Sequence, residues 1–387
     1  MKLPLSYSIR NLAVRKTTTI MTALGISATV AVLMAVLALV QGLNTAFSST
    51  GHPLNVLVMR KGSDAELNSN FSRSVFQDLK FKEGIAKGTN GQPLASLELV
   101  TVINLPSVDN PEGVNVTLRG LDMSGVEMRG LTLTEGRWFE SGKREIVIGK
   151  AIAKRFPDGK IGNNLHFGKG EWRIVGIMDA DRSAVNSEIF ADLNQAAADY
   201  DRVDVLSAAL VRATDELSRN ALINDLKTDQ RLNVDARTEK DYYAQQTVSA
   251  IPIAALGMFV AVIMAVGSSF AGMNTMFAAV ARRSREIGTL RILGFSKGSI
   301  LIAFFLESLG LALIGGLIGV VLVLPISNVT TAIGSFTSFS EISFNFQVTP
   351  TLIAAGLAFA LIMGALGGLI PAYLASRKQI LNALRDI

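Results

Sequence analysis

The sequence predicts an integral membrane protein with four transmembrane helices and a large mixed α/β extracytoplasmic domain inserted between helices 1 and 2. Three observations predict this fold. Charged side chains make up only 18% of the 387 residues, whereas soluble domains carry about 25%. Four long runs are almost free of charge. Between the first two runs, residues 44–250 hold 25 basic and 28 acidic side chains, the density of an ordinary folded domain.

The four apolar runs are long enough to cross a bilayer as helices. Residues 20–40 would form a helix of about 31 Å, which matches a hydrocarbon core of about 30 Å. A cleaved signal peptide is the alternative for this run, but the run is longer than a signal h-region and no A-x-A-like site follows it. In chain order we expect a cytoplasmic N-terminal segment (1–18), transmembrane helix 1 (19–43), the outer domain (44–241), a stalk with transmembrane helix 2 (242–281), a cytoplasmic segment (282–299), transmembrane helix 3 (300–333), an extracytoplasmic loop (334–350), transmembrane helix 4 (351–375) and a cytoplasmic tail (376–387).

Lysine and arginine predict the orientation of the spans. They are enriched before the first run, between the second and third runs, and after the fourth, whereas residues 334–350 carry Glu341 and no basic side chain. Short cytoplasmic loops favour Lys and Arg. We therefore expect both termini in the cytoplasm and the large insert on the outer side.

The insert has the patterning of a mixed α/β domain. Alternating or continuous apolar residues predict strands over 55–59, 97–104, 114–121, 145–148, 173–177 and 206–212, and helices over 73–81, 150–156, 192–198 and 215–225. Its carboxylates are interspersed with basic residues, which indicates solvated faces. From Tyr242 to Ala281 only Pro252 interrupts a helical pattern, so the second span is expected to continue outward as a stalk through Tyr243, Gln245 and Gln246. A short loop before an ordinary span is the alternative.

The composition excludes several kinds of chemistry. There is no cysteine and there are two histidines, His52 and His166, so thiol catalysis, disulfides and iron–sulfur clusters are excluded and a transition-metal site is unsupported. The glycine-rich residues 162–170 have the wrong spacing for a phosphate loop, and residues 294–298 match a nucleophile elbow only by chance. The basic excess lies beside apolar runs, which does not suit a nucleic-acid binder. We therefore predict no catalytic, cofactor-binding or metal-binding residue.

The segment between the second and third runs carries the most information. As a helix, it would place Ile287, Leu290 and Leu293 near one face, with Gly294 at its C-terminus. Such a short amphipathic helix suits docking into a groove of another protein. It would equally suit an interfacial helix on anionic lipid, and the segment alone leaves both readings open.

Inside the third run lies a single charge, Glu307, about two turns from the start. A carboxylate at the bilayer centre costs about 2.5–3.5 kcal/mol on insertion scales, so we expect it to reach the interface or to pair with a nearby arginine. A proton relay would need acidic partners within the membrane, and the runs contain none. Small residues permit close helix packing, within the subunit or across a dimer. They are Gly315, Gly316, Gly319, Gly364 and Gly368.

Residues 283–294 read R-x-R-E-I-G-x-L-R-x-L-G, which resembles the signature between spans two and three of the MacB/FtsX-type permeases of ABC transporters. This family includes the lipoprotein-releasing LolC/LolE subunits and works by type VII mechanotransmission. Residues 135–139, 145–149 and 173–176 are similar to its periplasmic core domain, and residues 10–26, 371–372 and 382–385 to its termini.

The resemblance implies a permease subunit, not an enzyme, in the bacterial inner membrane. It would couple ATP hydrolysis by a separate cytoplasmic ATPase dimer to movement of the periplasmic domain, as a homodimer or pseudo-dimer with a periplasmic adaptor, and so drive export or release of an extracytoplasmic substrate. ATP and Mg would be bound by the partner ATPase, which MacB carries fused at its N-terminus and which this chain needs in trans. The implied ATPase-coupling residues are Arg282, Arg283, Arg285, Glu286, Ile287, Gly288, Leu290, Arg291, Leu293 and Gly294. Alternatives are a lipoprotein-release or cell-wall-hydrolase-activating FtsX-like subunit, or a membrane scaffold or sensor without transport.

Overall fold

The computed structural model describes residues 16–108, 110–181, 183–247, 251–335 and 339–377, with side chains from residue 19 onward. The chain forms two compact units. The first, called the helical unit here, comprises Met1–Gln41, Ile251–Val329 and Phe346–Ile387. The second, the outer domain, comprises Gly42–Ala250 and Thr330–Asn345.

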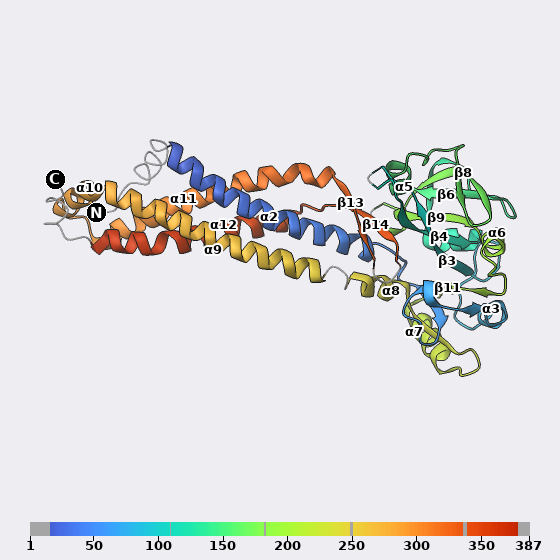
Figure 1. Ribbon diagram of the computed structural model, residues 1–387. Helices are drawn as coiled ribbons and strands as arrows, with labels where there is room; N and C mark the ends of the chain where they lie inside the picture. Colours follow the sequence, from blue (N-terminus) through green and yellow to red (C-terminus); the bar gives the residue numbers. More distant parts are fainter. Residues whose placement is uncertain (1–15, 109, 182, 248–250, 336–338, 378–387) are drawn as a thin grey trace. The chain divides into compact units, whose positions relative to one another are not determined.

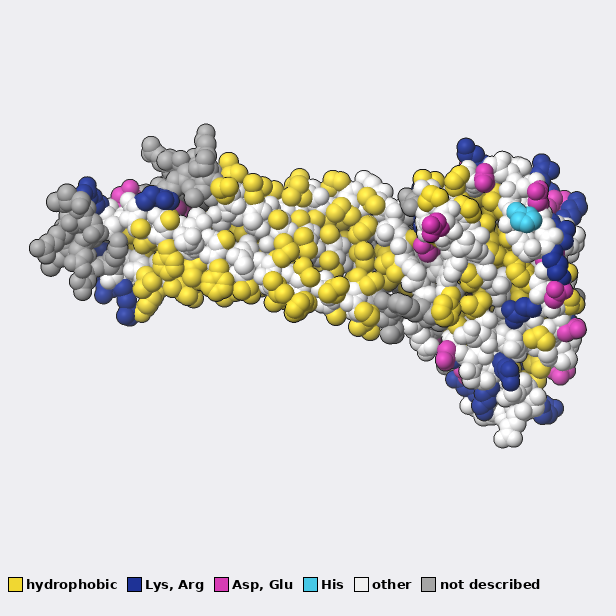
Figure 2. Space-filling view, viewed as in Figure 1, with side chains coloured by type: hydrophobic (Ala, Val, Ile, Leu, Met, Phe, Trp, Pro, Cys, Tyr) yellow, Lys and Arg dark blue, Asp and Glu magenta, His cyan; other side chains and the backbone are white. Residues whose placement is uncertain are grey.

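Four helices of the described chain are long and apolar enough to cross a membrane, and an α/β domain lies between the first and second, so the predicted fold class is confirmed (Figure 1). Hydrophobic side chains cover the surface of the helical unit, while its charged side chains gather at one end (Figure 2). Its elements are α2 (Lys16–Ser48), α9 (Ile251–Arg282), α10 (Ser284–Ile292), α11 (Lys297–Val323), η4 (Leu324–Asn328) and α12 (Pro350–Arg377).

Glycines let these helices pack closely within one chain. A Cβ on Gly315 would lie 2.8 Å from Cβ of Ile26, and a Cβ on Gly319 would lie 2.8 Å from the carbonyl of Ser27, both on α2. The other three small residues belong to the α11–α12 contact: Gly316 faces Ala360, Gly364 faces Ala312, and Gly368 faces Ser308. All five glycines thus contact helices of their own subunit.

One open sheet of ten strands forms the centre of the outer domain, in the order β12-β1-β11-β3-β4-β9-β6-β8-β5, with β7 paired to β8. Most neighbours are antiparallel, but β4/β9 and β6/β8 are parallel. The strands are β1 (Asn55–Arg60), β3 (Ala95–Leu105), β4 (Val114–Leu121), β5 (Thr132–Gly136), β6 (Glu145–Gly149), β7 (Asn164–Phe167), β8 (Gly170–Asp179), β9 (Glu188–Asp192), β11 (Ala208–Arg212) and β12 (Val234–Thr238), and β2 (Phe71–Ser72) pairs separately with β10 (Val205–Leu206).

Short helices cover this sheet. They are η1 (Glu66–Asn68), α3 (Arg73–Leu79), α4 (Met123–Arg129), α5 (Lys150–Arg155), η2 (Ala184–Ser187), α6 (Leu193–Asp199), α7 (Glu216–Thr228) and α8 (Glu239–Gln246). Polar side chains cap several of them: Asp122, Asp192 and Asp215 each accept the backbone N–H of the residue three positions on. The core is apolar and fully buried at residues such as Trp172, Ile148 and Leu118.

The outer domain also includes a segment from the far end of the chain. Helix 3 was predicted to run to residue 333, but α11 gives way to the one-turn η4, which contains Pro325, and Thr330–Gly334 is a strand. Strands β13 (Thr330–Gly334) and β14 (Glu341–Asn345) form a hairpin. Because the β-branched Thr330, Thr331 and Ile333 suit a strand and find a partner in β14, tertiary pairing overrides the helical reading.

The predicted stalk also differs. Tyr243, Gln245 and Gln246 lie in α8, which packs against β1 and β12, and Tyr243 is only 5% exposed. Its aromatic ring is buried in the outer domain, so this end of the predicted stalk is part of the domain's own packing. Residues 248–250, which would join α8 to α9, lie outside the described residues.

Candidate functional site

The α9–α11 connection contains the residues that the sequence singles out. Helix α9 ends at Arg282, Arg283 bends the chain with φ −102° and ψ 17°, and α10 follows at once. The turn keeps backbone hydrogen bonding, because the Arg283 N–H bonds to the Ala279 carbonyl at 3.3 Å and the Arg283 carbonyl accepts from Ile287 at 3.0 Å. The bend thus joins α10 to α9 without a loop.

A buried ion pair anchors this bend. Arg283 is 2% exposed, and its Nη1 donates to Oε2 of Glu307 on α11 at 2.8 Å. The guanidinium also lies 5.5 Å from the ring centroid of Phe304 and 3.8 Å from the carboxylate of Glu286. Glu307 is therefore paired with an arginine, one of the two states expected for it. Removing one partner from a buried pair typically costs about 3–5 kcal/mol, so the pair holds α10 firmly to α11.

Apolar packing fixes the inner face of α10. Ile287 is 2% exposed and lies in one cluster with Ile300 and Phe304 of α11 and with Ala375 of α12. The three residues of the predicted apolar face differ in burial. Ile287 is buried and Leu290 half-buried, whereas Leu293 is exposed, because the helix ends at Ile292 and Leu293 is already its C-terminal cap.

The end of α10 presents apolar and charged side chains to solvent. Ile292 is 58% exposed and Leu293 63% at the end of the helix, and Arg285 and Glu286 are exposed in its first turn. Gly294, with φ +90°, turns the chain away, and the N–H groups of Gly294 and Phe295 return to the carbonyls of Arg291 and Leu290. The end of α10 is therefore an exposed apolar tip formed by Ile292 and Leu293.

Ser296 has a structural role. Its hydroxyl accepts the backbone N–H of Ser299 at 3.2 Å and caps α11. The G-x-S-x-G pattern of residues 294–298 is therefore a helix end followed by a helix start, as expected for a chance match.

The structure places the predicted coupling residues in two groups. Arg283, Ile287 and Gly288 are buried, and Leu290 and Arg291 are half-buried. The exposed group is Arg282, Arg285, Glu286, Leu293 and Gly294, to which the structure adds Ile292, a residue that sequence reasoning missed. The signal for its exposure was its position, one residue before Leu293, the C-terminal cap of α10.

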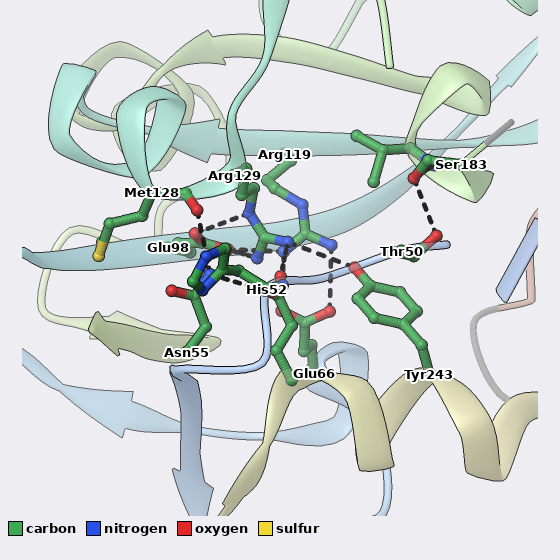
Figure 3. A network of polar contacts seen from close by, with 12 residues as sticks. Thr50, His52, Asn55, Glu66, Glu98, Arg119, Met128, Arg129, Ser183 and Tyr243 are labelled. Carbon is green, nitrogen blue, oxygen red and sulfur yellow. Dashed lines mark hydrogen bonds and ion pairs between the residues drawn. The ribbon is translucent and has the colours of Figure 1, made fainter. Parts of the chain in front are cut away.

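The outer domain holds buried charges that the sequence analysis assigned wrongly to solvated faces. Arg119 is 1% exposed and contacts the buried carboxylates of Glu66 and Glu98 (Figure 3). It also contacts the buried carboxylate of Glu188. Arg119 and Glu98 stand within the apolar strands β4 and β3, which was the signal that could have revealed them. A metal site has no support among the described residues, which contain no group of three potential ligands.

Comparison with known proteins agrees with this geometry. Residues 19–229 match the MacB-like periplasmic core domain, and residues 258–380 match the FtsX-like permease C-terminal domain. The chain belongs to the MacB-like periplasmic core domain family. It is an ABC transporter permease of the MacB, FtsX and YknZ type, and a membrane protein.

Two relatives illustrate the similarity. The uncharacterized ABC transporter permease YknZ of Bacillus subtilis is 25% identical over 98% of this chain and 97% of its own length. The macrolide export ATP-binding/permease protein MacB of Acinetobacter baylyi is 24% identical over 95% of this chain, which spans 57% of that relative. Among solved structures, the periplasmic region of MacB from Actinobacillus actinomycetemcomitans is 13% identical, covers 52% of this chain and 94% of its own, and has a TM-score of 0.38.

Proposed function

We propose that this permease is driven by a separate cytoplasmic ATPase that binds the exposed end of α10. The main observation behind this proposal is that one side of α10 packs against neighbouring helices while its end is exposed. Arg283–Glu307 and Ile287 tie it to α11 and α12, while Ile292 and Leu293 remain exposed. A force applied to this tip would reach α9 and α11 directly. The nearly full-length alignment with YknZ, whose name is that of a permease alone, supports an ATPase on another chain.

The same proposal covers the nucleotide-binding partner, the orientation of the chain and the membrane in which it lies. ATP and Mg are bound by the partner, both termini and α10 face the cytoplasm, and the membrane is the bacterial inner membrane. In the chain, α8 of the outer domain precedes α9. Helix α2 continues to Ser48, and its last turns belong to the outer domain. Movement of the helices would thus be passed to the outer domain, in a homodimer that works with a periplasmic adaptor to export or release an extracytoplasmic substrate. The name of the MacB relative, a macrolide exporter, favours export over lipoprotein release.

The coupling assignment is tested with Leu293→Asp. The tagged full-length chain is purified from membranes of cells that express it natively, and vanadate-sensitive ATP hydrolysis in the eluate is measured. A charge on the apolar tip removes its burial on the partner, so the activity should fall at least tenfold. Leu217→Asp is the matched control, because Leu217 is 83% exposed on α7 of the outer domain.

Full activity with Leu293→Asp would contradict coupling through α10. ATP hydrolysis by the chain purified without any partner would contradict the separate ATPase.

A further inference from the structure

The outer domain has attachment points in two different parts of its sheet. Helix α8, which precedes α9 in the chain, packs against β1 and β12. The end of α2 and the β13–β14 hairpin attach instead at η2: Thr50 shares a 2.8 Å hydrogen bond with Ser183, and the Ser343 N–H donates to Oγ of Ser187 at 2.7 Å. In the order of the sheet, β1 and β12 lie on one side of the β3–β4 strand pair and β6, which η2 contacts, lies on the other, while β14 of the hairpin also contacts β4.

A continuous path of buried polar contacts joins these attachments. On the α8 side, the Tyr242 hydroxyl accepts the backbone N–H of Glu66 at 3.3 Å. Arg119 of β4 holds the Glu66 carboxylate through Nη1 at 2.7 Å and Nη2 at 3.1 Å. On the other side, Arg119 holds Glu188 through Nε at 2.6 Å and Nη2 at 3.1 Å. Glu188 directly follows Ser187 of η2. Two bidentate ion pairs on one guanidinium therefore connect the α8 attachment to the η2 attachment.

A second branch strengthens the α8 side. Arg119 donates to Glu98 of β3 at 2.6 Å, Glu98 accepts from Arg129 of α4 at 2.8 Å, and Arg129 pairs with Glu239 at the start of α8 (Figure 3). Asn55 of β1 donates to Glu239 at 2.7 Å. Arginine can hold several carboxylates in fixed directions because its guanidinium is planar and offers five N–H donors.

Burial makes these contacts geometrically demanding. Burial raises the pKa of Glu98, but the charges of Arg129 and Arg119 outweigh this effect and hold the pKa below its usual value. Burial likewise lowers the pKa of Arg119, and Glu188 and Glu66 raise it well above the usual value. These pKa directions favour the charged forms of Glu98 and Arg119, so separating the two attachments would leave a buried charge without its partner.

We propose that Arg119 is a positioning residue that holds the α8 attachment and the η2 attachment of the outer domain in a fixed relation, so that the domain responds as one body when the membrane helices move. The proposal rests on the proposed function for its purpose, but the fixed relation exists without an ATPase. Loss of Arg119 or of Glu188 would loosen the relation between the two attachments while each side keeps its own fold.

The test measures the distance between two spin labels on the full-length chain in nanodiscs without nucleotide. The chain has no cysteine, so Ala244→Cys on α8 and Lys154→Cys on α5, both exposed, provide unique sites. The background chain should give one narrow distance distribution. Arg119→Met and Glu188→Gln should each at least double its width, and Arg119→Lys, which keeps the charge but not the fork, should give an intermediate width.

Two controls separate this effect from general unfolding. A label pair within one side, Lys143→Cys with Lys154→Cys, should keep its distribution in every variant. Arg137→Met, which removes a half-exposed pair with Glu145, should leave the Ala244–Lys154 distribution unchanged. Circular dichroism checks that each variant is folded.

Unchanged widths for Glu188→Gln and Arg119→Lys in folded protein would overturn the proposal, whatever happens to Arg119→Met. Broadening of both label pairs would also overturn it, because the network would then serve only folding. The spin-label experiment contains no ATPase, so a negative result in it does not bear on coupling through α10. A negative result with Leu293→Asp likewise does not bear on the role of Arg119.

Discussion

At the scale of single residues, the Arg283–Glu307 pair shows how a charge can stay within an apolar helix bundle. The carboxylate alone would be costly in an apolar surrounding, and the arginine at the bend neutralises it at 2.8 Å. The sequence predicted that Glu307 would either reach the interface or pair with an arginine, and several arginines in the preceding segment were candidates. The bend at residue 283, which aims one of them inward, depends on packing that no local pattern describes.

Replacing Arg283 by Met should destabilise the helical unit by about 3–5 kcal/mol, because Glu307 is left buried without its partner. The double variant Arg283→Met with Glu307→Gln should regain most of that loss. Thermal unfolding in detergent measures both. Arg282→Met is the matched control, since Arg282 is exposed and next in the chain; a control as unstable as Arg283→Met would mean that the loss comes from the α9 end and not from the pair.

At the scale of elements, periodicity predicted those strands and helices whose conformation follows from their local sequence. Strand β4 was predicted at its observed bounds, and β1, β3, β6 and β8 within a few residues. Strands β5, β7, β9 and β12 were not predicted, because each has only four or five residues and depends on a neighbouring strand for pairing. The hairpin after α11 was taken as the end of a span for the same reason: its partner strand lies eleven residues further on.

Close helix contacts make a prediction at this scale. Gly315→Ala should destabilise the helical unit by about 1–3 kcal/mol, because the added methyl group meets Ile26 and the Ala23 backbone below 3.0 Å. Gly267→Ala on α9 has no atom within 4 Å and should be neutral or slightly stabilising, given the better helix propensity of alanine. Melting temperatures in the same detergent compare the two. Equal effects would show that α2 does not approach α11 as closely as described.

At the scale of the whole molecule, composition alone predicted a four-span membrane protein with one large inserted domain, because charge density distinguishes a domain in water from helices in lipid. The mixed charges of residues 282–299 between two apolar runs also predicted a short amphipathic segment, whose coupling role stays a prediction. Which of its residues face inward could not be predicted, since Ile287 and Leu293 look alike in the pattern and only tertiary packing separates them. The Arg119 network could not be predicted for a related reason: the three carboxylates that Arg119 contacts come from three segments, 21 to 69 residues away in the chain.

The predicted orientation is measurable because the chain has no native cysteine. In intact spheroplasts, a membrane-impermeant maleimide should label Leu217→Cys in the outer domain at once. Lys297→Cys, exposed at the start of α11, should react only after permeabilisation. The unsubstituted chain gives the background. Labelling of Lys297→Cys in intact spheroplasts would reverse the topology.

The β13–β14 hairpin has a consequence for biosynthesis. Arg155 and Thr117 obtain contacts from Glu341 at 2.7 Å and from Ser340 at 2.7 Å, residues made long after the rest of the domain. At about 5–20 residues per second, the ribosome needs roughly 5–20 s to proceed from residue 250 past 345. During that interval the part of the outer domain already synthesised has some of its polar surface uncovered. A secreted fragment ending at residue 250 would keep that surface uncovered permanently.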